Sequence, residues 1–236
     1  MNMIKHEHRA TVAHHSMAMV GGFFGVYALL NRGDTFGSSA TANLIYLFVA
    51  GLSGSRQEFT IRLGAAAVYI SGIIFATWIF RYFKERDFRY LSVAVDIIAC
   101  LILAQIPADT DSVLALYPMF FAAAVQWLAY TNASGYNSAT VFSTNNTRQC
   151  FAGLTEYLCD HDPAQLARFR FFGGTLLCFH AGVVYCWFCM RAWELKSIYA
   201  CIPLLVWVGI AAWLDRRGGH KVEEHVHRDR AKYELT

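Results

Sequence analysis

Charged residues are scarce in this sequence. Asp, Glu, Lys and Arg make up 16% of its 236 residues, against roughly 25% in an average soluble domain. Hydrophobic residues reach 56%, and runs such as 63–80 contain no charge. Such runs are too long to be the buried strands of a soluble α/β core. The scarcity of charge therefore argues against a large soluble core and predicts an all-α, polytopic transmembrane helical bundle.

The sequence also lacks the short motifs that identify many enzymes and nucleotide-binding proteins. It has no phosphate-binding glycine loop, no H-E-x-x-H and no nucleophile elbow. Cys186 and Cys189 form a C-x-x-C pair, but the pair falls in an apolar run and has no partner ligands. The cysteines, mostly in apolar runs, are expected to behave as small hydrophobic residues. We therefore predict no enzyme activity, no catalytic residue, no cofactor and no metal.

Apolar runs of about 20 residues predict the membrane-spanning helices. We expect six spans and two shorter helices, each of which follows a polar break and is broken or re-entrant. The spans cover 12–30, 61–80, 90–106, 113–130, 169–191 and 198–214, and the short helices cover 39–52 and 140–158. A single domain would then occupy residues 1–214, with repeat halves at 12–106 and 113–214, and a polar cytoplasmic tail at 215–236.

The alternative is eight full spans, and charge asymmetry favours six. The segment 81–89 carries four basic residues, and only the six-span layout places it on the same side as the basic tail. Basic loops lie preferentially in the cytoplasm. We therefore predict a multi-pass protein of the bacterial inner membrane with both termini in the cytoplasm. The clustered basic residues fit an anionic membrane surface better than nucleic acid.

The two polar breaks are related in sequence. Thr41-Ala-Asn43 aligns with Ser143-Thr-Asn145, and the A-G-L of 50–52 aligns with that of 152–154. Because each half holds three full spans, the second half would be inserted upside down relative to the first. This inverted repeat is the construction of many transporters and channels. Chance recurrence of small residues is the alternative.

At these breaks the sequence resembles the YoaK-type bacterial membrane proteins. Residues 22–26 (GFFGV), 33–36 (GDTF) and 40–43 (ATAN) are similar to the family patterns G-y-v-D-a, G-x-v-F and M-T-G-N. Residues 124–126 (AVQ) and 140–148 (TVFSTNNTR) are similar to its second signature, G-M-Q-N and T-v-v-T-G-T-l-t-R.

The resemblance covers about residues 15–215 and is that of a divergent member. Gly25 stands where the family has an aspartate, Ala42 where it has a glycine, and Trp127 where it has an asparagine. Asp96 stands where the family tends to have a glutamate in an apolar helix. The resemblance implies a six-span membrane protein, often labelled a transporter, and carries over no activity.

Polar side chains at the breaks are the expected solute-binding residues. A helix that begins within the membrane has unpaired N–H groups and a partial positive charge at that end. Two such ends facing each other suit an anion or a small hydrogen-bonding solute. The candidates are Thr41, Asn43, Gln126, Ser143, Thr144 and Asn145. Alternatively, these side chains serve only to satisfy broken backbone.

Asp96 is the candidate proton-coupling residue, because a carboxylate in mid-span is costly and usually functional. His180, on the repeat-related span, is its candidate partner. A structural hydrogen bond for Asp96 and simple packing for His180 are the alternatives. Histidines also cluster near both ends of the chain, where we expect them to be solvated; a joint metal or pH-sensing site is the other reading. They are His6, His8, His14, His15, His220, His225 and His227.

These observations predict a small-solute transporter or channel with a midplane polar site at two broken helices. Its expected partners are the lipid bilayer and an unknown small solute, with no nucleic acid; homo-oligomerisation is left open. The alternative is a non-transporting membrane scaffold or sensor that uses its basic, His-rich cytoplasmic ends.

Overall fold

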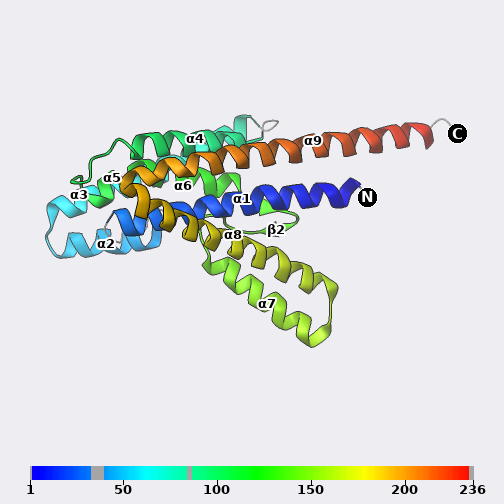
Figure 1. Ribbon diagram of the computed structural model, residues 1–236, viewed down its shortest axis with the longest axis horizontal. Coiled ribbons are helices and arrows are strands. Elements are labelled where there is room, and N and C mark those ends of the chain that lie inside the picture. Colours follow the sequence, from blue (N-terminus) through cyan, green and yellow to red (C-terminus); the bar gives the residue numbers. More distant parts are fainter. Residues whose placement is uncertain (1, 33–39, 84–86, 234–236) are drawn as a thin grey trace.

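The computed structural model describes residues 2–32, 40–83 and 87–233, and these are almost wholly helical (Figure 1). The α-helices are α1 (Asn2–Asn31), α2 (Ala40–Leu52), α3 (Arg56–Tyr82), α4 (Arg89–Leu103), α5 (Ser112–Ala115), α6 (Tyr117–Ala129), α7 (Thr144–Asp160), α8 (Pro163–Trp193) and α9 (Cys201–Tyr233). A 3₁₀ helix, η1 (Glu194–Ala200), joins α8 to α9. Strands β1 (Asn132–Ala133) and β2 (Tyr136–Asn137) pair antiparallel between α6 and α7. The all-α prediction is confirmed.

Capping residues explain where several helices begin. The Asp111 carboxylate accepts the N–H groups of Val113 and Leu114 at the start of α5. Asp162 accepts the N–H of Ala164 at the start of α8, where Pro163 is the first helical residue. Both arrangements satisfy first-turn donors, and proline at this position loses no intrahelical hydrogen bond.

Large apolar side chains are exposed along several helices. Examples are Phe48, Ile74, Leu177 and Phe188, with exposed fractions of 69%, 63%, 75% and 62%. Extensive exposure of this kind indicates contact with lipid or with other proteins. With the apolar composition of the helices, it indicates a membrane protein.

Helix length alone does not give six spans. Among the residues that the structure describes, two helical stretches are long and apolar enough to cross a bilayer by length and composition, Arg56–Tyr82 and Pro163–Arg217. The second contains α8, η1 and the start of α9, and the chain reverses direction at η1 (Figure 1). Helices α4 and α6 have only 15 and 13 residues, fewer than the roughly 20 that cross a bilayer untilted. The six-span layout therefore stays a proposal.

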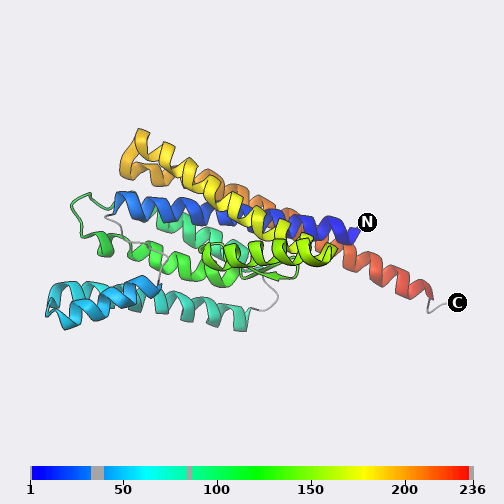
Figure 2. The ribbon, with the colours of Figure 1, turned by 90° about the horizontal axis from the view of Figure 1, so that it is seen from below.

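The helices pack across the two halves of the chain. Helix α1 packs along α8 and α9, whereas α6 packs along α3 and α4. Helices α2 and α3 form one hairpin and α7 and α8 form another, and α4 meets α9. Figure 2 shows α1 among the helices of the second half. The first long helix of each half thus lies against the last two long helices of the other.

Two glycines allow α1 and α8 to approach closely. A methyl group at Gly22 would overlap the carbonyl oxygen of Phe179, and one at Gly182 would overlap that of Met19. The two backbones are therefore in contact, as in other small-residue helix interfaces of membrane proteins.

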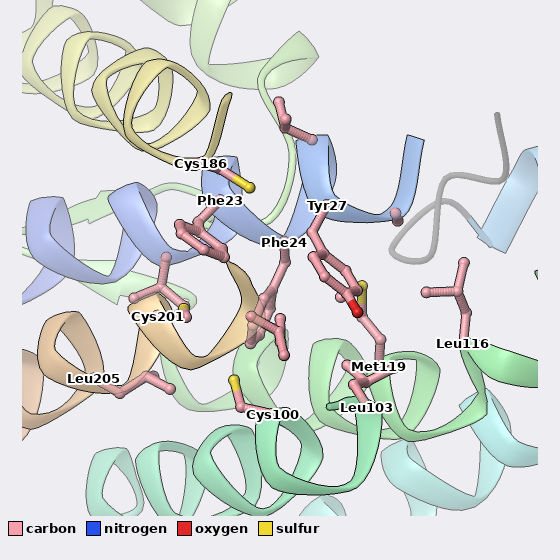
Figure 3. Close-up of a cluster of buried hydrophobic side chains, with 14 of the residues drawn as sticks. Phe23, Phe24, Tyr27, Cys100, Leu103, Leu116, Met119, Cys186, Cys201 and Leu205 are labelled. Carbon is pink, nitrogen blue, oxygen red and sulfur yellow. The ribbon is translucent and has the colours of Figure 1, made fainter. Parts of the chain in front are cut away.

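Aromatic side chains of α1 fill the space between α4, α8 and α9 (Figure 3). They meet three free cysteines that pack as apolar residues. The labelled side chains are Phe23, Phe24, Tyr27, Cys100, Leu103, Leu116, Met119, Cys186, Cys201 and Leu205.

Candidate functional site

A pocket of about 700 Å³ is lined by the starts of the two short helices, α2 and α7. Thr41, in the first turn of α2, lines it from one side. Thr144 and Asn145, the first residues of α7, line it from the other. Tyr69 of α3, Trp127 of α6, Phe142 and Arg148 complete the lining. The starts of both short helices therefore border one cavity.

The start of α7 leaves polar groups available at this pocket. Ser143 is the N-cap residue, but its side chain makes no capping hydrogen bond. Its carbonyl accepts the N–H and the hydroxyl of Thr147, at 2.8 and 3.0 Å. One turn further, Arg148 Nη2 donates to Asn145 Oδ1 at 3.2 Å. In the sequence, Arg148 was included only as part of a family motif and was not predicted as a site residue. Its position one helical turn after Asn145 was the signal that could have identified it.

A buried chain of hydrogen bonds holds the segment before α7 against α1. Asn146 Nδ2 donates to the carbonyls of Ala139 and Phe142, at 2.7 and 3.1 Å. Asn146 Oδ1 accepts from the Ser138 hydroxyl at 2.9 Å. The Ser138 oxygen can then accept from His14 Nε2, 3.0 Å away. The neutral His14 ring therefore carries its proton on Nε2, because Asn146 Oδ1 can only accept.

The histidines near the start of the chain are not uniformly solvated, contrary to expectation. His14 is 1% exposed, and His15 is half-buried with its Nε2 3.0 Å from the Phe171 carbonyl. His8 is exposed, as expected. The physical reason is that α1 begins before the apolar run, so its first turns pack on α8 and on the segment before α7. The side chains of His6, His220, His225 and His227 lie outside the described residues.

Gln126 is buried beside this segment and does not line the pocket. Its Nε2 donates to Thr140 Oγ1 at 3.1 Å and to the Met17 carbonyl at 3.4 Å. Its Oε1 has no hydrogen-bond partner among the described residues. Gln126 thus links α6 to α1 and to the second break.

Asn43 is also buried, and it borders a separate cavity of about 170 Å³. That cavity is apolar, with walls from α2, α3 and Phe120, and it shares Tyr69 with the larger pocket. Of the predicted binding residues, the structure therefore brings Thr41, Thr144 and Asn145 together. It places Asn43, Gln126 and Ser143 around them.

Asp96 and His180 are not brought together. Asp96 is fully buried in α4, where the Ser92 hydroxyl lies 3.4 Å from its Oδ2. Its Oδ1 has no hydrogen-bond partner within the described part of the chain. His180 is exposed on α8, and its Nδ1 lies 2.8 Å from the Leu176 carbonyl of its own helix.

An ion-pair cluster that does not line this pocket lies where the start of α4 meets α9. Arg89 Nη2 contacts Asp87 at 2.6 Å, and its Nη1 contacts Asp215 of α9 at 2.8 Å. Burial lowers the pKa of the Arg89 guanidinium, but the hydrogen bonds and charges of the two carboxylates outweigh it. They hold that pKa above its ordinary value. The cluster ties α4 to α9.

Fold and pocket together describe a helical membrane protein in which the starts of two short helices, α2 and α7, line one cavity. A family model described as Protein of unknown function (DUF1275) matches residues 14–212, and the chain therefore belongs to this family. The resemblance to YoaK-type proteins is consistent with that assignment. No curated protein and no solved structure matches the chain.

Proposed function

We propose that this protein is a small-solute transporter or channel of the bacterial inner membrane, and that the 700 Å³ pocket binds the solute. The observation that carries the proposal is that one pocket is lined by the starts of both short helices, α2 and α7. Thr41 comes from the first half of the chain, and Thr144 and Asn145 come from the second. Solute sites of many transporters lie between two such interrupted helices.

Reciprocal packing supports an inverted repeat. If the halves are exchanged, α1 corresponds to α6, α2 to α7, α3 to α8 and α4 to α9. The contact of α1 with α8 then corresponds to that of α6 with α3, and α1 with α9 to α6 with α4. The α2–α3 hairpin corresponds to the α7–α8 hairpin, and the α4–α9 contact corresponds to itself. The turns of the two hairpins lie toward opposite ends of the molecule (Figure 1).

The proposed layout has six spans, formed by α1, α3, α4, α6, α8 and α9, with both termini in the cytoplasm. Helices α2 and α7 each begin near the pocket and reach only one face. The start of α1 and the end of α9 lie at the same end of the molecule (Figure 1). Asp87 and Arg89 also lie at that end, beside Asp215. Arg89, at the start of α4, and the end of α9 that carries the basic tail thus share one side, which supports a cytoplasmic assignment.

Asp96 is the proposed proton-coupling residue, acting without His180. It is fully buried, and one carboxylate oxygen has no hydrogen-bond partner in the described ranges. Ionisable groups inside a membrane protein most often serve ion or proton movement. Asp96→Asn should therefore abolish the dependence of uptake on a proton gradient while leaving solute binding intact.

Uptake into proteoliposomes tests the transport proposal. The purified chain would be assayed with a panel of radiolabelled small anions, neutral solutes and cations. For the solute that is transported, Thr41→Val and Asn145→Ala should each lower the rate about tenfold or more, because each removes a polar group from the pocket wall. Thr155→Val, on the exposed face of α7, is the matched control. Unchanged uptake in the pocket variants, or no uptake of any solute, would contradict the proposal.

A further inference from the structure

We infer that the pocket between the two breaks takes a small organic anion, a carboxylate with an apolar or aromatic body. This inference rests on the proposed function and gives it a substrate class. Three features of the described part of the pocket carry it: an arginine with no carboxylate partner there, a lining there without acidic side chains, and aromatic walls.

Arg148 is the one charged side chain among the described residues that line the pocket. Within the described part of the chain, its guanidinium forms no ion pair, and its hydrogen bond goes to the neutral amide oxygen of Asn145. A guanidinium presents five N–H donors in a planar fork that matches a carboxylate. Most of those donors are therefore free to bind an anion.

The electrostatics of the pocket favour a negative charge. No carboxylate lies among the described residues that line the pocket, so that part of the wall offers no charge to balance a bound cation. Arg148 is exposed in the pocket wall, so its guanidinium is accessible to a solute, and a bound anion would supply the carboxylate partner that it lacks among the described residues. The first turn of α7, a helix of 17 residues, adds partial positive charge beside Arg148.

The size and walls of the pocket favour an organic body over an inorganic ion. Its volume of about 700 Å³ falls within the roughly 300–1,000 Å³ typical of small-molecule sites. Tyr69, Trp127 and Phe142 supply aromatic surface, and the rings of Trp127 and Phe142 meet edge to face at 6.1 Å. Thr41 and Thr144 supply hydroxyl groups. An aromatic carboxylate would place its ring against these walls and its charge on Arg148.

Calorimetric titration of the full chain in detergent tests this inference without requiring transport. Benzoate, phenylacetate and hexanoate are the anionic probes, and benzamide is the uncharged match for benzoate. We expect at least one carboxylate to bind, and benzamide to bind at least tenfold more weakly than benzoate. Arg148→Gln should weaken carboxylate binding roughly 10- to 100-fold, because this loss of affinity corresponds to the net free energy of a hydrogen bond to a charged group. Arg148→Lys keeps the positive charge but loses the planar guanidinium. Its affinity for carboxylates should lie between those of the unsubstituted protein and Arg148→Gln.

Arg170→Gln is the matched control, because Arg170 is exposed on the same α7–α8 hairpin and does not line the pocket. It should bind as the unsubstituted protein does. Melting temperatures of all variants would show that each is folded. Equal binding of benzoate and benzamide, no binding of any carboxylate, or binding unaffected by Arg148→Gln would overturn the inference. Uptake of a neutral solute that is sensitive to Asn145→Ala would then still support the transport proposal.

Discussion

Asn145 and Asn146 are neighbours in the chain, but their side chains lie in different environments. Asn146 is buried and makes three hydrogen bonds that close the second break. Asn145 is half-buried, lines the pocket and accepts one hydrogen bond from Arg148. One residue thus holds the break together, and the other faces the solute in the proposed mechanism.

We expect Asn146 to contribute mainly to the stability of the fold and Asn145 mainly to solute binding. Asn146→Ala should lower the free energy of unfolding by about 2–4 kcal/mol, since it leaves buried polar groups without partners. Asn145→Ala should cost under about 0.5 kcal/mol while weakening solute binding. Unfolding in mixed micelles, followed by circular dichroism, gives both values. Equal losses of stability in the two variants would show that Asn145 is structural as well.

Sequence reasoning located Thr41, Thr144 and Asn145 because short polar residues at a helix start have few other physical roles. It did not predict that Tyr69, Trp127 and Arg148 also line the pocket. An aromatic residue on an apolar helix gives no local sign of facing a cavity. Gln126 and Asn43 were also predicted to bind the solute, but both are buried and neither is among the residues that line the larger pocket. Burial and partners depend on helix packing, which local sequence does not encode.

At the scale of the element, the contact between α1 and α8 depends on glycine. Gly182→Ala should lower the free energy of unfolding by about 1–3 kcal/mol, because the new methyl group overlaps the Met19 backbone and forces the helices apart. Gly173→Ala on the same helix is the control. Its methyl group would lie 3.6 Å from Cys150 Sγ, an ordinary contact. Thermal unfolding of both variants is the measurement, and equal melting temperatures would contradict the close approach.

Polar contacts join α4 to α9 at one end of α4, and they join the residues that follow α4 to η1 at the other. At the end with the termini, Arg89 bridges Asp87 and Asp215. At the other end, Lys196 donates to the Ala104 carbonyl and Gln105 donates to the Tyr199 hydroxyl. These polar contacts join parts of the chain that belong to opposite halves of the proposed repeat.

The ion pair between Arg89 and Asp215 should contribute measurably to stability. Its side chains are 21% and 5% exposed, and partly buried ion pairs resist screening better than surface pairs. Asp215→Asn should cost about 1–3 kcal/mol of unfolding free energy. Glu58→Gln removes the charge of a carboxylate that pairs with Arg62 but is itself 49% exposed, and it should cost under about 1 kcal/mol. A double-mutant cycle on Arg89 and Asp215 would isolate the pair, and a coupling energy near zero would contradict this account.

The positions of the helices were predictable, whereas their lengths were less so. Apolar periodicity and breaker residues placed all eight expected helices close to their counterparts. Helix α1 nevertheless begins at Asn2 and α9 continues to Tyr233, because polar ends can extend a helix beyond its apolar run. Helix α6 is shorter than expected because α5 ends and Pro118 opens a new helix. The segment 33–39, which includes the GDTF stretch, lies outside the described residues.

At the scale of the whole molecule, the first long helix of each half packs against helices of the other half. Helix α1 packs on α8 and α9, and α6 packs on α3 and α4. The matching order of features in the sequence suggested two related halves but not this exchange. Which helices pack together depends on surface shape and on close approaches such as that of Gly22 and Phe179.

Cysteine labelling tests the proposed layout in the membrane. Thr110→Cys, in the turn between α4 and α5, should react with a membrane-impermeant maleimide added to intact cells. Tyr82→Cys, at the end of α3, should react only in inverted vesicles. Both positions are accessible in the structure, and the background would carry serine at Cys159 and Cys178. Labelling of residue 82 from outside would reject the six-span layout.

The central claim is that both breaks border one pocket through which the solute passes. The most direct test is uptake by proteoliposomes of a Thr41→Cys, Thr144→Cys double variant, in the same serine background, before and after a short dithiol-reactive cross-linker. The account predicts that the cross-link forms and stops uptake. Each single cysteine variant should keep its own rate after the same treatment. Full uptake in the cross-linked protein, or no cross-link between the two positions, would contradict the claim.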